Sequence, residues 1–114
     1  MTVIRTLIAG TLLAVGLTAN AQEPVFDSAY EVGLEDFRLP ASTTGLVTLR
    51  ECRGCEFITI QADANTVYRL NGEAIQFNDF RRSILLARQR NVQKPVVVLR
   101  NLDTNTVRSV SIRF

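Results

Sequence analysis

The chain has 114 residues, and its 13 lysines and arginines against 11 aspartates and glutamates give a formal net charge of only +2. That balance excludes the strong basic excess of a typical nucleic-acid-binding domain. Histidine, the residue most used for proton transfer and metal ligation, is absent from the sequence. The composition therefore predicts no nucleic-acid partner, no cofactor and no metal site.

Residues 1–21 have the three parts of a secretory signal peptide. Arg5 supplies a positive charge, an apolar stretch spans Thr6–Leu17, and Ala19-Asn20-Ala21 offers a small-residue cleavage site. The apolar stretch is about 12 residues long, whereas a helix that crosses a bilayer needs roughly 20. We therefore expect cleavage after Ala21, no stable membrane span after cleavage, and a mature protein in the periplasm or outside the cell.

Residues 22–44 have the least regular pattern of the mature chain, with Pro24 and Pro40 interrupting scattered apolar positions. Apolar and other residues alternate only over 30–34, which predicts a short edge strand. We expect an irregular N-terminal segment here, followed by a single α+β domain over residues 45–114.

Two hairpins are expected next. The β-branched and apolar runs 46–51 and 56–61 are separated by only four residues, and the runs 66–70 and 73–76 are joined by Asn71-Gly72. Asn-Gly tolerates the two positive φ angles of a type I′ turn, so the second hairpin has a strong local signal.

Residues 77–91 change to a helical period, the only one in the mature chain. Asn78 stands where a side chain can cap the helix start, and Asp79 suits the positive end of the helix dipole. Leu85 is expected on the apolar side of this helix. The aromatic residues at strand or helix spacing are expected in the core: Phe57, Tyr68, Phe77, Phe80 and Phe114.

Four arginines fall on the polar side of the predicted helix: Arg81, Arg82, Arg88 and Arg90. Residues 80–114 hold eight basic residues and one acidic residue, whereas residues 22–79 hold four basic and ten acidic. The four arginines are a candidate partner-binding face for an acidic partner or polyanion, and the alternative is an ordinary solvated surface on which the charges of the two halves interleave.

Two strands complete the prediction. Val96–Leu99 is a continuous apolar run, typical of a central strand covered on both faces, and Val107–Phe114 alternates like a half-buried strand. The predicted fold is α+β: a mostly antiparallel sheet of five to six strands, in the order β-β-β-β-α-β-β, with one helix packed on one face.

Cys52-Arg53-Gly54-Cys55 is the main chemical signal, and three interpretations compete. A four-residue turn brings its ends close enough for a disulfide, and Gly54 at the third position permits the positive φ of a type II turn. A redox-active pair usually starts a helix, but Cys55 is followed by a strand pattern. A metal site would have only two cysteine ligands. In an oxidising compartment the disulfide is favoured.

The stretch Tyr68-Arg69-Leu70-Asn71-Gly72-Glu73, followed by a helix and Val96-Val97-Val98, resembles the periplasmic domain of the ExbD and TolR energy-transducing proteins. The resemblance covers roughly residues 66–100 and consists of a hairpin, a helix and a strand in that order. The chain departs from this family because it lacks a full-length transmembrane helix with an aspartate and carries the cysteine pair.

The sequence thus predicts a small exported, disulfide-stapled protein without catalytic residues. It would bind another protein or an envelope component through an exposed strand edge or the arginine face. The alternative is a thiol-disulfide redox protein or redox sensor that uses Cys52 and Cys55.

Overall fold

The computed structural model describes residues 27–114, and the predicted signal peptide lies outside these described residues. The described chain combines one α-helix with an eight-stranded sheet, which confirms the α+β class. In chain order the elements are β1 (Asp27–Val32), the single-turn helix η1 (Leu34–Asp36), β2 (Phe37–Arg38), β3 (Leu46–Leu49), β4 (Ile58–Gln61), β5 (Val67–Leu70), β6 (Glu73–Ile75), α2 (Phe77–Gln89), β7 (Val96–Asn101) and β8 (Thr106–Ile112).

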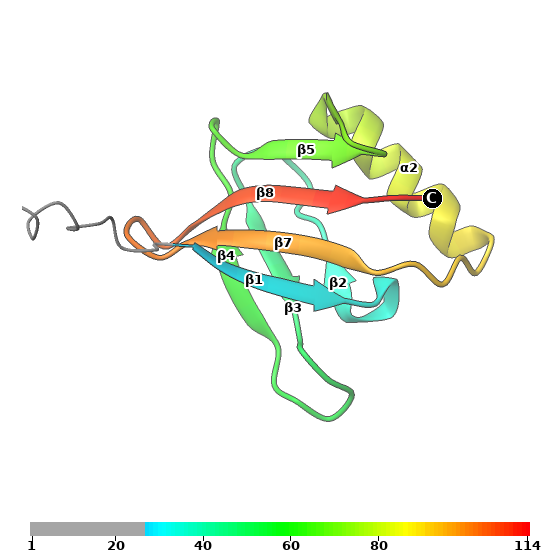
Figure 1. The fold of residues 1–114 in the computed structure, drawn as a ribbon, viewed down its shortest axis with the longest axis horizontal. Helices are drawn as coiled ribbons and strands as arrows, with labels where there is room; N and C mark the ends of the chain where they lie inside the picture. Colours follow the sequence, from blue (N-terminus) through cyan, green and yellow to red (C-terminus); the bar gives the residue numbers. More distant parts are fainter. Residues whose placement is uncertain (1–26) are drawn as a thin grey trace, which may run out of the picture.

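The last strand, β8, joins the two halves of the sheet. It pairs antiparallel with β7 along one side, and along its other side it pairs parallel with β5 and, at Gln61↔Thr106, with β4. Strands β2, β3 and β4 cross behind β1, β7, β8 and β5 at a steep angle (Figure 1). The expected sheet of five to six mostly antiparallel strands is therefore corrected to a larger, mixed sheet. The parallel pairs join strands far apart in the sequence, which local patterns do not reveal.

The N-terminal segment is more regular than the sequence indicates. An edge strand is present, but β1 starts three residues earlier than the predicted 30–34 and ends at Val32; it pairs with β7 over six residues and forms one end of the sheet. The expectation of an otherwise irregular segment is corrected by η1 and by β2, which pairs with β3 at Phe37↔Leu49. Val32, Leu34 and Phe37 are buried in the core, so this segment is part of the same packed unit.

Both hairpins are confirmed. At the β5–β6 turn Asn71 and Gly72 have φ values of 53° and 88°, as a type I′ turn requires. The β3–β4 hairpin is paired only as far as Leu49↔Ile58, so its loop is longer than the four residues expected from the sequence.

Helix α2 spans Phe77–Gln89, within the helical pattern of residues 77–91, but its capping differs from the prediction. Gln76 is the N-cap residue and makes no side-chain capping bond, while Asn78 lies within the first turn, so the predicted Asn78 cap is wrong. At the other end Asn91 adopts a φ of 53°, and the N–H of Val92 donates to the carbonyl of Ala87 at 3.0 Å. This is a Schellman ending, in which asparagine takes the place usually held by glycine.

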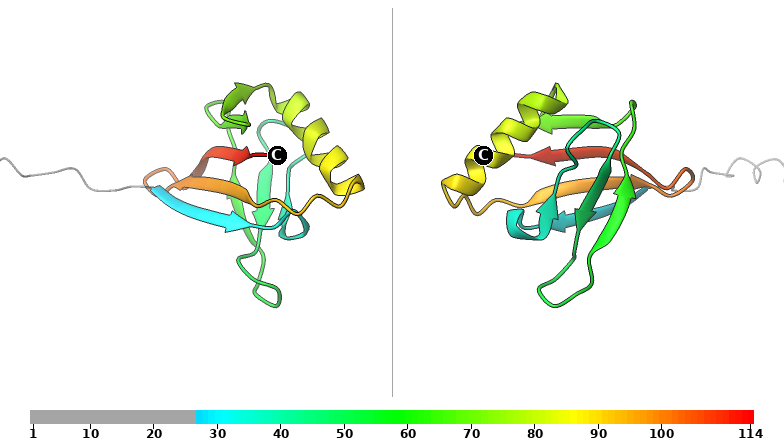
Figure 2. Two further views of the ribbon diagram at one scale, coloured as in Figure 1. Left: turned by 45° about the vertical axis from the view of Figure 1, so that its right-hand side comes forward. Right: turned by 180° about the vertical axis from the view of Figure 1, so that it is seen from behind.

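The core lies between the two halves of the sheet and α2, which closes one end of the molecule (Figure 2). Helix α2 buries Phe77, Phe80, Ile84 and Ala87, and the rings of Phe77 and Phe80 lie 5.1 and 5.4 Å from that of Tyr68 on β5. Leu85 is 42% exposed, which corrects its predicted place on the apolar side. Successive helical residues are about 100° apart, so Leu85 faces away from its buried neighbour.

Strand β7 lies between β1 and β8, but it is covered on only one face. Val96 and Val98 are fully buried, while Val97 and Leu99 are only half-buried on the outer face, so the expectation of coverage on both faces is wrong. Strand β8 buries Val110 and Ile112 on the predicted alternation, but an irregularity in its pairing with β7 breaks the alternation before Ser109, so Val107 is buried as well.

Candidate functional site

The predicted disulfide joins Cys52 and Cys55 in the β3–β4 loop. Their Cα atoms are 5.1 Å apart, and the N–H of Cys55 donates to the carbonyl of Cys52 at 3.1 Å, which closes a β-turn. Gly54, at the third position of this turn, has a φ of 96°. A positive φ there is the feature of a type II turn that favours glycine, as the sequence predicted.

The β3–β4 loop, which contains the disulfide, projects from the rest of the molecule (Figure 1). Residues 51–57 are all exposed, including Phe57, which corrects its predicted place in the core. The loop is held at its base by Arg50, whose Nε lies 2.6 Å from Oδ1 of Asp36 and whose guanidinium carbon lies 4.8 Å from the Phe57 ring centroid. The disulfide therefore staples a surface loop and does not pack in the core.

The surroundings of the cysteine pair are those of a turn between strands. Residues 50–57 contain no helix, and the chain continues from Cys55 into β4, so neither cysteine lies at a helix N-terminus. Within residues 27–114, no group of three or more histidine, cysteine, aspartate or glutamate side chains is placed to hold a metal ion. In the same part of the chain, no helix has the length and apolar character needed to cross a membrane.

The four predicted arginines do not form one continuous face. Arg82 pairs with Asp79 at 3.3 Å, and Arg90 lies at the end of α2. Arg88 is half-buried, and its Nη2 donates to the carbonyl oxygens of Leu34, at 3.3 Å, and of Phe37. Arg88 therefore ties the helix to η1 and β2, a structural role that the polar side of a helical pattern does not reveal.

Arg81 and Arg88 line a small hollow on the surface together with Arg38 of β2. Burial and then the neighbouring charge of Arg38 lower the pKa of Arg88 from its ordinary value, because both disfavour the charged form. Arg38 was not among the residues that the sequence singled out, since nothing in the local pattern places β2 beside the helix.

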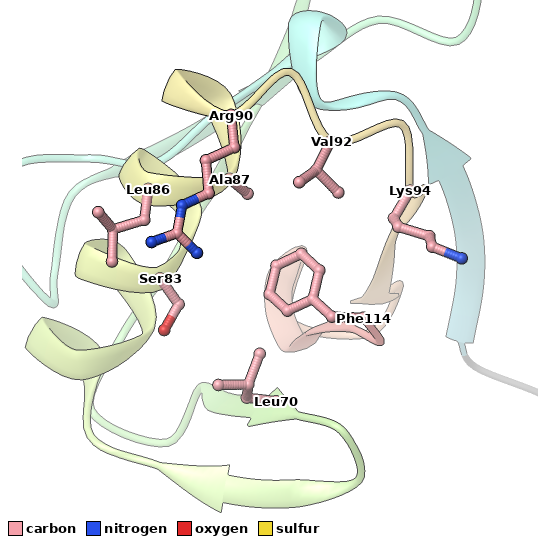
Figure 3. Close-up of a pocket in the computed structure, with 8 residues that line it drawn as sticks. All are labelled: Leu70, Ser83, Leu86, Ala87, Arg90, Val92, Lys94 and Phe114. Atoms are coloured by element: carbon pink, nitrogen blue, oxygen red, sulfur yellow. The ribbon is translucent and has the colours of Figure 1, made fainter.

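A groove of about 350 Å³ lies between α2 and the adjacent ends of β5 and β8. Most of its lining is carbon, and Leu86 and Phe114 remain 42% and 49% exposed, which corrects the predicted burial of Phe114. Figure 3 shows the eight lining residues, which are Leu70, Ser83, Leu86, Ala87, Arg90, Val92, Lys94 and Phe114.

Arg90 gives this groove its charge. Its guanidinium extends over the hollow beside Leu86, whereas the ammonium of Lys94 points outward from the rim (Figure 3). None of the lining residues is an aspartate or glutamate. The groove therefore combines apolar walls with the positively charged side chain of Arg90. Of its lining residues, sequence reasoning singled out Arg90, while Leu86, Val92 and Lys94 carried no signal as a group because the fold brings them together.

The chain matches no protein-family model, no curated protein and no solved structure. Its candidate sites are therefore defined by geometry alone: the exposed disulfide loop, the hollow with three arginines, and the apolar groove that carries Arg90.

Proposed function

We propose that this chain is a small exported, disulfide-stapled binding protein without catalytic activity. Its groove between α2 and the ends of β5 and β8 would receive a segment of another envelope protein, in which a large apolar side chain stands next to a carboxylate. The observation that carries the proposal is the pairing of exposed Leu86 and Phe114 with the guanidinium of Arg90 in one hollow.

The dimensions favour a peptide anchor. A volume of about 350 Å³ is near the lower end for ligand pockets, and the groove is open along the surface. Such a site suits one or two apolar side chains of a larger partner, because the rest of that partner covers the open side. Aromatic side chains in partly buried pockets often dominate binding energy, which makes Phe114 the expected main contact.

The charge favours an acidic partner. Arg90 offers a planar set of donors that matches a carboxylate, and charge-assisted hydrogen bonds are stronger than neutral ones. Lys94 at the rim adds positive potential that attracts an acidic segment before contact.

The expected export of the protein supports a partner in the cell envelope. The signal-peptide pattern of residues 1–21 is a property of the sequence, and the Cys52–Cys55 disulfide suits an oxidising compartment. We place the protein in the periplasm or outside the cell, where a partner in the envelope is accessible.

Selection from a random-peptide display library tests the proposed groove. We expect enriched peptides to carry a large apolar residue close to an aspartate or glutamate, and their binding to be lost in Leu86→Glu and in Arg90→Glu. The matched control is Leu102→Glu, because Leu102 is 52% exposed on the β7–β8 turn and does not line the groove.

Two outcomes would count against the proposed groove. One is equal loss of binding in Leu86→Glu and the control. The other is enrichment of peptides that shift the backbone amides of β1 when they bind, because that result would assign recognition to an open strand edge of the sheet.

A thiol-disulfide function is a second candidate, supported by the exposure of Cys52 and Cys55. An accessible disulfide can exchange with a thiol, but neither cysteine is at a helix N-terminus that would stabilise a thiolate. Titration against glutathione separates the two functions: a reduction potential below about −300 mV marks a structural bond, and one near about −200 mV favours the redox function.

A further inference from the structure

The hollow between β2 and α2 is a separate site from the groove of the proposed function. It has a volume of about 200 Å³, and three of its six lining residues are arginines. Arg38 comes from β2, while Arg81 and Arg88 come from α2 one above the other, since a spacing of seven residues is close to two helical turns. The apolar part of the lining is Leu39, Ile84 and Leu85.

The three guanidinium groups have no carboxylate partner among the described residues. The three ion pairs found within residues 27–114 use Arg50, Arg82 and Arg108. Glu35 lines the adjoining hollow together with Arg38 and Arg88, but it forms none of these ion pairs, and its Oε1 lies 3.0 Å from the position that a Cβ on Gly33 would occupy. The positive charge of the hollow is therefore left to the solvent or to a bound anion.

Arg88 is held in place before any ligand arrives. Its Nη2 donates to the carbonyl oxygens of Leu34 and Phe37, which fixes the planar group between η1, β2 and the helix. A guanidinium has five N–H donors, so this tether leaves others for an anion. Burial and then the nearby charge of Arg38 lower the pKa of Arg88, and an anion between the two arginines would relieve their repulsion.

We propose that this hollow binds a phosphate group through Arg38, Arg81 and Arg88. Three arginine side chains line this small space, and several guanidinium donors match the acceptor oxygens and double negative charge of a phosphate better than they match a single carboxylate. Leu85, which is 42% exposed, gives the attached organic part an apolar surface to lie on. The phosphate could belong to a soluble phosphate compound or to a lipid headgroup, since both present the same phosphate group to the arginines.

Titration with inorganic phosphate, followed by backbone amide shifts of the full chain, is the first test. We expect saturable shifts around Arg81, Ile84 and Leu85, and an affinity about tenfold weaker in Arg38→Gln and in Arg81→Gln. Both side chains are exposed, so these variants should keep the fold, which far-UV circular dichroism checks. Arg82→Gln is the matched control, because Arg82 is adjacent in sequence, carries the same charge and pairs with Asp79 outside the hollow.

Vesicle sedimentation distinguishes the two sources of phosphate. Binding to phosphatidylcholine vesicles that contain phosphatidic acid, lost in the same two variants and absent without phosphatidic acid, would assign a lipid headgroup. Saturable phosphate binding without vesicle binding would assign a soluble compound. The proposal is overturned if neither probe binds, or if Arg82→Gln weakens binding as much as Arg81→Gln, since the attraction would then be a diffuse property of the basic surface.

Discussion

Replacement of Arg88 by methionine should destabilise the fold, because this arginine joins three elements. Its Nη2 donates to two backbone carbonyls, those of Leu34 in η1 and Phe37 in β2. A hydrogen bond from a charged donor contributes about 1.5–3 kcal/mol, but Arg88 is only half-buried and water can replace part of what is lost. Relief of the repulsion from Arg38 offsets a further part. We expect a net loss of about 2 kcal/mol.

Urea denaturation followed by circular dichroism measures this loss directly, and thermal unfolding should show a decrease in Tm of about 10 °C for a domain of this size. Methionine keeps much of the aliphatic stem, so the effect is not simply lost packing. Arg81→Met is the control, because it removes the same charge from an exposed position on the same helix and should change the free energy of unfolding by less than about 0.5 kcal/mol. Equal destabilisation by the two substitutions would refute the structural role of Arg88.

Four other predictions concern the disulfide, the buried Tyr68 (two of them) and the leader. Replacement of both Cys52 and Cys55 by alanine should lower the free energy of unfolding by no more than about 2 kcal/mol, because the loop that they close is short. The protein should stay folded, and loss of the folded state in denaturation curves would contradict this. Tyr68→Phe should leave stability unchanged or raise it by up to about 1 kcal/mol, because the Tyr68 hydroxyl is buried without a hydrogen-bond partner among the described residues; clear destabilisation in urea would reveal a missed partner. Burial, and then the charge of Asp63, raise the pKa of Tyr68 above its ordinary value of 10.0, so the unfolded chain releases this proton at a lower pH than the folded chain does. The free energy of unfolding should therefore fall above about pH 10, and it should fall less steeply in Tyr68→Phe. The intact mass of protein purified from its producing cells should correspond to cleavage after Ala21 and the loss of two hydrogens at the cysteines, and a full-length mass would contradict export.

The parts of the fold that sequence predicts well are those determined by neighbouring residues. Asn71-Gly72 allows the two positive φ angles of the β5–β6 turn, and Gly54 allows the single positive φ angle of the turn between the cysteines. Both turns therefore follow from the conformational freedom of neighbouring residues. The helical period of residues 77–91 likewise predicted α2 and most of its buried side.

The errors have a common physical cause, which is contact between distant parts of the chain. The parallel pairing of β8 with β5 depends on how the chain returns after α2 and β7, and no local pattern encodes that return. Phe114 has the alternation of a core residue, yet it lies beyond the last paired residue of β8 and faces an open groove. Arg88 follows the polar side of the helix, but its long side chain reaches carbonyls 54 and 51 residues away in sequence.

The candidate sites also divide into one that neighbouring residues determine and two that contacts between distant residues determine. The disulfide was predictable because its residues are three apart in sequence and its turn is local. The groove and the arginine hollow were not, because their side chains come from β2, β5, α2 and the residues that follow α2 and β8, which meet only in the folded protein.

Binding of an acidic, apolar peptide in the groove is the central claim, and an amide-shift titration with a peptide enriched by the display selection tests it most directly. The claim predicts saturable shifts at Leu86, Val92 and Phe114, and an affinity that falls about tenfold or more in Arg90→Glu but not in Arg53→Glu, an equal charge reversal on the exposed disulfide loop. Shifts confined to β1 or to the disulfide loop, or equal loss of affinity in the two variants, would contradict it.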